Sequence, residues 1–122
     1  MERSSERLIE ISSSNRTEPF VTKDGSTIRE LHHTPVQSLA EATLEVEQAT
    51  ERHYHRVTEE IYFVVKGQGK LEIDGETTHM KPGDAALIPP GAWHQLENNG
   101  TSELRILCMC APPYSHDDTY FE

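Results

Sequence analysis

Three histidines and a carboxylate in this chain have the residue types and the spacing of a metal-ligand set. His53 and His55 are one residue apart, the acids Glu59 and Glu60 follow after a short break, and His94 lies further along. In a strand, residues two apart project to the same face, so His53 and His55 can bind one ion together. Imidazoles with one carboxylate suit Fe(II), Mn(II), Ni(II), Co(II), Cu(II) or Zn(II) rather than Ca²⁺ or Mg²⁺. The sequence therefore predicts a site for one divalent transition metal.

The strand expected to carry the carboxylate begins at the two acids. Residues 61–65, Ile-Tyr-Phe-Val-Val, form an almost continuous apolar run, and we expect this strand to be buried on both faces. A carboxylate leading into such a strand is costly to bury unless it is paired or bound to a cation. Strand alternation sends Glu59 and Glu60 to opposite faces, so only one of them can join the histidines.

Turn-forming residues divide most of the chain into short strand-like runs. Such turns occur at Asp24-Gly25, Asp74-Gly75, Pro82-Gly83 and Asn99-Gly100. Many short strands at this spacing predict an all-β sandwich or barrel. Asp74-Gly75 follows the alternating run 71–73 and predicts a tight hairpin.

The length of 122 residues predicts a single domain. We expect residues 1–16 to form a flexible arm or an edge strand, and residues 17–111 to form the barrel. Residues 112–122 are expected to be an extended strap, because two consecutive prolines cannot continue a strand ladder.

The charge balance excludes some partners. The chain has 21 acidic residues against 11 Lys and Arg, a formal charge of −10, so nucleic acid and anionic membranes are not expected to bind. The sequence contains no long apolar run, and it begins with polar residues. We therefore expect a cytoplasmic protein. Cys108 and Cys110 share one face of a strand, and we interpret them as small buried residues rather than a disulfide; a reactive or ligating thiol is the alternative.

Two longer motifs extend the metal-ligand pattern, and through them the chain resembles a small single-domain cupin. The first cupin motif, G(x)5HxH(x)3,4E(x)6G, is matched by His53, His55, Glu60 and Gly67, except that Glu47 stands at its opening glycine. We expect this departure to change only the local turn. The second motif, G(x)5PxG(x)2H(x)3N, is matched at every fixed position, by Gly83, Pro89, Gly91, His94 and Asn98.

The resemblance implies an antiparallel jelly-roll β-barrel with the metal inside it. His53, His55, Glu60 and His94 would be the four ligands. Around an ion with octahedral coordination, these four ligands would leave two positions for water, dioxygen or a chelating substrate. The resemblance to small cupins also implies a homodimer. In this chain the apolar segment Leu8 to Ile11 and exposed strand edges could pair with a second copy.

Strand parity selects pocket candidates around these ligands. Tyr62 shares the face of Glu60, Leu96 shares the face of His94, and Cys108 faces inward from a late strand. His32 and His33 are adjacent and cannot both face inward; one of them could reach the pocket as a supporting or acid/base group, but we favour a structural role. His116 lies on the expected strap, which leaves a lid role open. Arg52 and Arg56 flank the histidine pair and leave a sugar phosphate open as a substrate.

Two classes of function fit this site. A metalloenzyme would act on a small oxygen-bearing organic molecule, as a dioxygenase-like oxidoreductase or as an isomerase or decarboxylase. The alternative is a cupin module that binds a small molecule or metal without turnover. The sequence identifies no catalytic residue, because it places no acid or base near the open metal positions.

Overall fold

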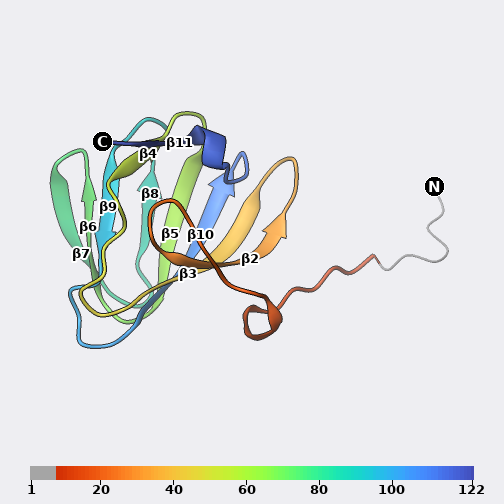
Figure 1. Ribbon diagram of the computed structural model, residues 1–122, viewed down its shortest axis with the longest axis horizontal. Coiled ribbons are helices and arrows are strands. Elements are labelled where there is room, and N and C mark those ends of the chain that lie inside the picture. Colours follow the sequence, from red (N-terminus) through yellow and green to blue (C-terminus); the bar gives the residue numbers. More distant parts are fainter. Residues whose placement is uncertain (1–7) are drawn as a thin grey trace.

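Two antiparallel β-sheets form the protein, as the sequence predicts. The computed structural model describes residues 8–122. Sheet A has the strand order β1-β2-β3-β10-β5-β8, and sheet B has the order β11-β4-β9-β6-β7. Several neighbouring strands, such as β3 and β10 or β4 and β11, come from distant parts of the chain, as in a jelly roll. Figure 1 shows β6, β7 and β9 on one side of the molecule and β2, β3 and β10 on the other. The predicted all-β jelly-roll fold is confirmed.

The strands are short and follow the turns named above. Sheet A consists of β1 (Phe20–Val21), β2 (Thr27–His33), β3 (Ser38–Leu44), β5 (Glu59–Lys66), β8 (Ala85–Ile88) and β10 (Leu104–Ala111). Sheet B consists of β4 (His53–His55), β6 (Gly69–Ile73), β7 (Glu76–Met80), β9 (His94–Glu97) and β11 (Thr119–Phe121). Asp74 and Gly75 both have positive φ, of 48° and 91°, between the paired strands β6 and β7. This is the predicted hairpin.

The core lies between the inner faces of the two sheets. Alternate residues of each strand enter it, among them Leu44, Val64, Leu71, Ile88, Leu96, Leu104 and Ile106, all of which are buried. The same alternation carries His53, His55, Glu60 and His94 inward. The period-two pattern therefore builds the core and delivers the candidate ligands to it.

The expectation that β5 is buried on both faces is wrong. Glu60, Tyr62 and Val64 are buried, whereas Ile61 and Phe63 are half-buried and Val65 is 45% exposed. On the outer face of sheet A, cross-strand pairs such as Phe63 with Leu107 of β10 cover these side chains in part. An apolar run in the sequence cannot distinguish this one-sided burial from two-sided burial.

The turn after β3 explains how the chain accommodates Glu47 in place of the motif glycine. The Gln48 amide donates to the Glu45 carbonyl at 3.0 Å, and Glu47, the third residue of this turn, has a φ of 71°. That position of such a turn favours glycine, because a side chain is strained in the left-handed region. The backbone keeps the glycine conformation although the side chain is glutamate.

Glu47→Gly should therefore stabilise the protein. Relief of the left-handed strain is worth about 1 kcal/mol in the free energy of unfolding, and the exposed Glu47 side chain leaves no core gap. Glu45→Gly is the control, because Glu45 is also exposed but lacks a positive φ; it should destabilise through backbone entropy alone. Thermal unfolding of both variants checks this, and a loss of stability in Glu47→Gly would contradict it.

The two ends of the chain pack differently. Residues 1–7 of the expected N-terminal arm lie outside the described part; beyond them a 3-10 turn, η1 (Ser14–Arg16), precedes β1, and Leu8, Ile9 and Ile11 are exposed. After the two prolines, η2 (His116–Asp118) leads into β11, which pairs with β4 beside His53 and His55. Across residues 8–122, no helix has the length and apolar character needed to span a membrane.

Candidate metal centre

Strands β4 and β9 bring the three histidines together. His53 and His55 project from β4 to one face, and His94 at the start of β9 is the direct cross-strand partner of His53. All three side chains are buried, and they offer ligand nitrogens that lie within 4.8 Å of one another. A buried group of three convergent imidazoles is typical of a transition-metal site.

Each histidine is oriented by a backbone carbonyl. Nδ1 lies 2.7 Å from the Glu51 carbonyl in His53, 3.2 Å from the Asp118 carbonyl in His55, and 3.0 Å from the Ala92 carbonyl in His94. A carbonyl can only accept a hydrogen bond, so Nδ1 carries a proton and Nε2 is the nitrogen left to face the interior of the barrel. This is the arrangement that prepares imidazole for metal binding through Nε2.

Glu60 lies beside two of these nitrogens. Its Oε1 is 3.4 Å from Nε2 of His55 and 3.5 Å from Nε2 of His94. Burial alone would raise the pKa of Glu60, but its interactions with His55 and His94 outweigh burial and hold the pKa well below its usual range. The carboxylate is therefore ionised in the core. The Cys110 thiol donates to its second oxygen, Oε2, at 3.4 Å.

The donor atoms at this site fit a metal ion. Within the described residues, three buried side-chain atoms lack a hydrogen-bond partner, and two of them are Glu60 Oε1 and His94 Nε2. Burying such atoms unpaired is costly. A divalent cation would satisfy both at once, and the set of nitrogens and one carboxylate oxygen suits the transition metals expected from the sequence.

A cavity adjoins the histidines inside the barrel. The pocket candidates Tyr62, Leu96 and Cys108 all line it, together with apolar residues such as Ala42 and Ile106. Burial raises the pKa values of the Cys108 and Cys110 thiols, with the nearby Glu60 carboxylate acting in the same direction. Both cysteines are therefore protonated and unreactive, in keeping with the interpretation as small core residues.

Other candidates from the sequence lie outside the cavity. Glu59 is exposed, so Glu60 is the acid that joins the histidines. His32 and His33 are both exposed, beyond a register shift between Glu30 and His32 of β2, and neither lines the cavity. His116 is exposed and contacts the Tyr114 hydroxyl instead. Arg52 lies on the outer face of sheet B, paired with Glu72 and positioned over the Trp93 ring.

The structure adds residues that the sequence did not indicate. Asp24, in the turn after β1, points into the cavity, and Tyr114 lines the cavity from the C-terminal segment. Burial raises the pKa of Tyr114 to about 12, so its hydroxyl is protonated. The sequence offered only a turn signal at Asp24 and an apparent end of structure at Pro112-Pro113. Neither signal indicates that the segment folds back over the barrel.

Asp118 positions His55 and the loop that follows it. Its carboxylate accepts hydrogen bonds from the amides of Arg56, Val57 and Thr58 at 3.1–3.2 Å, and its carbonyl faces Nδ1 of His55. The C-terminal segment thereby fixes the chain between the candidate ligands His55 and Glu60.

Asp118→Ala should loosen the metal site. It leaves three amides without their acceptor, and we expect a loss of about 1–3 kcal/mol in the free energy of unfolding and about 10-fold in metal affinity. Asp117→Ala is the matched control, because Asp117 is exposed in the same turn. Chelator competition and denaturant unfolding measure the two effects. Equal behaviour of the two variants would remove Asp118 from this role.

Comparison with known proteins identifies the family. An uncharacterised protein of Methanocaldococcus jannaschii is 46% identical over 110 residues, covering 86% of this chain and 88% of that protein. An oxalate-binding protein of Thermotoga maritima is 27% identical over 81 residues, covering 66% of this chain and 67% of that protein. The structure of KdgF from Halomonas sp. superposes with a TM-score of 0.80 at 19% identity, covering 90% of this chain and 98% of that chain. The cupin domain model matches residues 40–110, and this chain therefore belongs to the cupin family.

Proposed function

We propose that this protein binds one divalent transition metal through His53, His55, His94 and Glu60, and that the metal holds a small oxygen-bearing molecule in the adjoining cavity. The observation that carries the proposal is the convergence of three buried imidazoles, each oriented by a carbonyl at Nδ1, beside a carboxylate whose Oε1 has no hydrogen-bond donor. The ion is one of Fe, Mn, Ni, Co, Cu or Zn.

The cavity restricts the ligand. Its volume is about 50 Å³, and one water needs about 10–15 Å³, so the cavity admits only a small molecule. Most of its lining side chains are apolar, and among the described residues that line it there is no Lys or Arg. A phosphate group would have no cationic side chain to bind, which disfavours the sugar phosphate left open by the sequence. A small, mostly apolar molecule that offers two oxygens to the metal fits best.

The chain's own residues hold such a ligand and exclude water. Leu96 and Tyr62 form apolar walls beside His94, and Cys110 holds Glu60 in place. When bound, a redox-active ion supplies dioxygen chemistry and a redox-inert ion polarises a carbonyl oxygen. We favour an enzyme of the dioxygenase or isomerase and decarboxylase type, because an enclosed, largely apolar cavity beside a candidate metal site suits catalysis.

Ligand binding and oxygen uptake test this function. Acetylacetone, a small β-diketone, should bind the Zn(II)-loaded protein in calorimetry and not the metal-free protein. Oxygen consumption by the Fe(II)-loaded protein with small diketones or hydroxyketones would support a dioxygenase. Failure of all such two-oxygen probes to bind the metal-loaded protein would contradict the proposed ligand class.

Metal-dependent binding without turnover is the second candidate. The similarity to an oxalate-binding protein favours it. Oxalate binding to the Zn(II)-loaded protein, with no consumption of oxygen or oxalate in any metal form, would select this function over an enzyme.

Two further expectations from the sequence stay predictions. A homodimer would cover the exposed Leu8, Ile9 and Ile11, and sedimentation of a stable monomer would contradict it. A cytoplasmic location is likewise proposed from the composition alone.

A further inference from the structure

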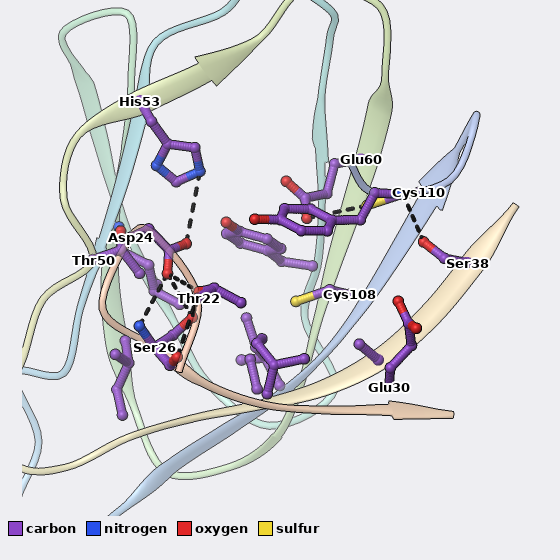
Figure 2. A pocket seen from close by; sticks show the side chains of 18 of the residues that line it. Thr22, Asp24, Ser26, Glu30, Ser38, Thr50, His53, Glu60, Cys108 and Cys110 are labelled. Atoms are coloured by element: carbon purple, nitrogen blue, oxygen red, sulfur yellow. Dashed lines mark hydrogen bonds and ion pairs between the residues drawn. The ribbon is translucent and has the colours of Figure 1, made fainter. Parts of the chain in front are cut away.

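A second carboxylate faces the histidine cluster from the N-terminal part of the chain. The turn between β1 and β2, residues 22–26, folds over the cavity and points Asp24 toward His53 (Figure 2). Asp24 Oδ2 lies 3.8 Å from His53 Nε2, the nitrogen that faces the proposed metal. The Asp24 side chain is 16% exposed, so water has little access to it.

The two oxygens of Asp24 have different environments. Oδ1 accepts three hydrogen bonds, from the hydroxyls of Thr22 at 2.6 Å and Ser26 at 2.7 Å and from the Ser26 amide at 3.0 Å. These contacts are those of an ordinary turn acid and involve only Oδ1. Oδ2 is left facing His53. The turn therefore fixes the carboxylate with one oxygen directed at the cluster.

The turn itself is anchored to the rest of the barrel. The Glu51 amide donates to the Asp24 carbonyl at 2.8 Å, and Gln48 Nε2 donates to the Gly25 carbonyl at 2.8 Å. Both donors belong to the segment that leads into β4, so the turn and His53 are held by the same piece of chain. Asp24 is thus preorganised toward His53 rather than placed by a free loop.

Glu60 lies close to two of the three histidines, and Asp24 lies close to the third. Glu60 Oε1 is 3.4–3.5 Å from the Nε2 atoms of His55 and His94, and Asp24 Oδ2 is 3.8 Å from that of His53. Two atoms bound to one ion at about 2.1 Å lie about 3 Å apart when adjacent and about 4.2 Å apart when opposite. The shortest carboxylate–imidazole separation of each histidine falls within this range. Figure 2 shows the two acids on different sides of the cavity.

We propose that Asp24 is a further protein ligand of the metal, bound through Oδ2. This inference rests on the proposed metal site, and it extends the ligand set beyond the two sequence motifs to the β1–β2 turn. Three imidazoles and two carboxylates would balance the charge of a divalent ion. A small molecule that binds the ion through two oxygens would then compete with Asp24.

The test compares Asp24→Asn with Asp84→Asn. Asparagine at position 24 retains an oxygen for the three bonds to Thr22 and Ser26 and loses the anionic ligand, so the turn is preserved. Asp84 is the control. Its carboxylate also accepts a hydrogen bond within its own turn, from the Lys81 amide at 3.0 Å, but Asp84 lies outside the cavity. Metal affinity is measured by chelator competition, and coordination by the visible absorption of the Co(II)-loaded protein.

Asp24→Asn should weaken metal binding about 10- to 100-fold and change the Co(II) spectrum, while Asp84→Asn leaves both unchanged. An unchanged affinity in Asp24→Asn overturns the proposal, and the metal site itself then stands without Asp24. A weaker affinity with an unchanged Co(II) spectrum also overturns it, because Asp24 would then act only by its charge. Absence of metal binding by the wild-type protein is a distinct outcome that rejects the proposed function first.

Discussion

The His94→Ala protein should bind divalent transition metals at least about 100-fold more weakly than the wild type. His94 is fully buried and points an Nε2 with no hydrogen-bond partner at Glu60, so its removal deletes a metal-facing nitrogen and leaves the carboxylate without that neighbour. A lost ligand is expected to exceed the 10- to 100-fold effect of losing a supporting contact. Chelator competition with Zn(II) and Co(II) measures the change.

His79→Ala is the control for this substitution. His79 is exposed on β7, so the same change of side chain should leave metal affinity unaltered. Circular dichroism of both variants establishes that the barrel is folded. Wild-type metal affinity in a folded His94→Ala protein would exclude His94 as a ligand.

Gly67→Ala should destabilise the barrel by about 3 kcal/mol. Gly67 follows β5 at a φ of 84°, and a Cβ there would lie 2.5 Å from the Glu103 carbonyl oxygen and 3.0 Å from Leu104 Cα. Both contacts are with backbone, so relief requires β5 and β10 to separate. The left-handed conformation adds about 1 kcal/mol and the close contact about 1–3 kcal/mol. Denaturant unfolding measures the loss.

Gly83→Ala separates the two contributions. Gly83 has a similar φ of 93°, but a Cβ there would meet nothing within 4 Å. It should therefore cost only the conformational part, about 1 kcal/mol. Equal destabilisation in the two variants would show that the close approach of β5 to β10 contributes nothing.

The local parts of the site follow from the sequence. A one-residue separation places His53 and His55 on the same face of any strand, and the parity of β5 places Glu60 with Tyr62 and Val64. These features need only period-two alternation. The position of His94 opposite His53 is set by strand pairing across 40 intervening residues, and only the resemblance to cupins indicated it.

The parts of the site that could not be predicted depend on segments that fold back over the barrel. Asp24 has the turn signal of any Asp-Gly pair, and its direction is set by hydrogen bonds from Gln48 and Glu51. Asp118 follows two prolines that end β10, yet the chain resumes as β11 beside β4. Such contacts arise from tertiary packing and leave no period or spacing in the sequence.

The most direct test is elemental analysis of the untagged protein beside its His53→Ala and Glu60→Ala variants, each after loading with Fe(II), Mn(II), Ni(II), Co(II), Cu(II) or Zn(II). The account predicts about one ion per chain in the wild type with at least one of these metals, and loss of that ion in both variants. A folded wild-type protein that retains none of the six metals would contradict the central claim, and the histidine cluster would then be part of a metal-free binding cavity.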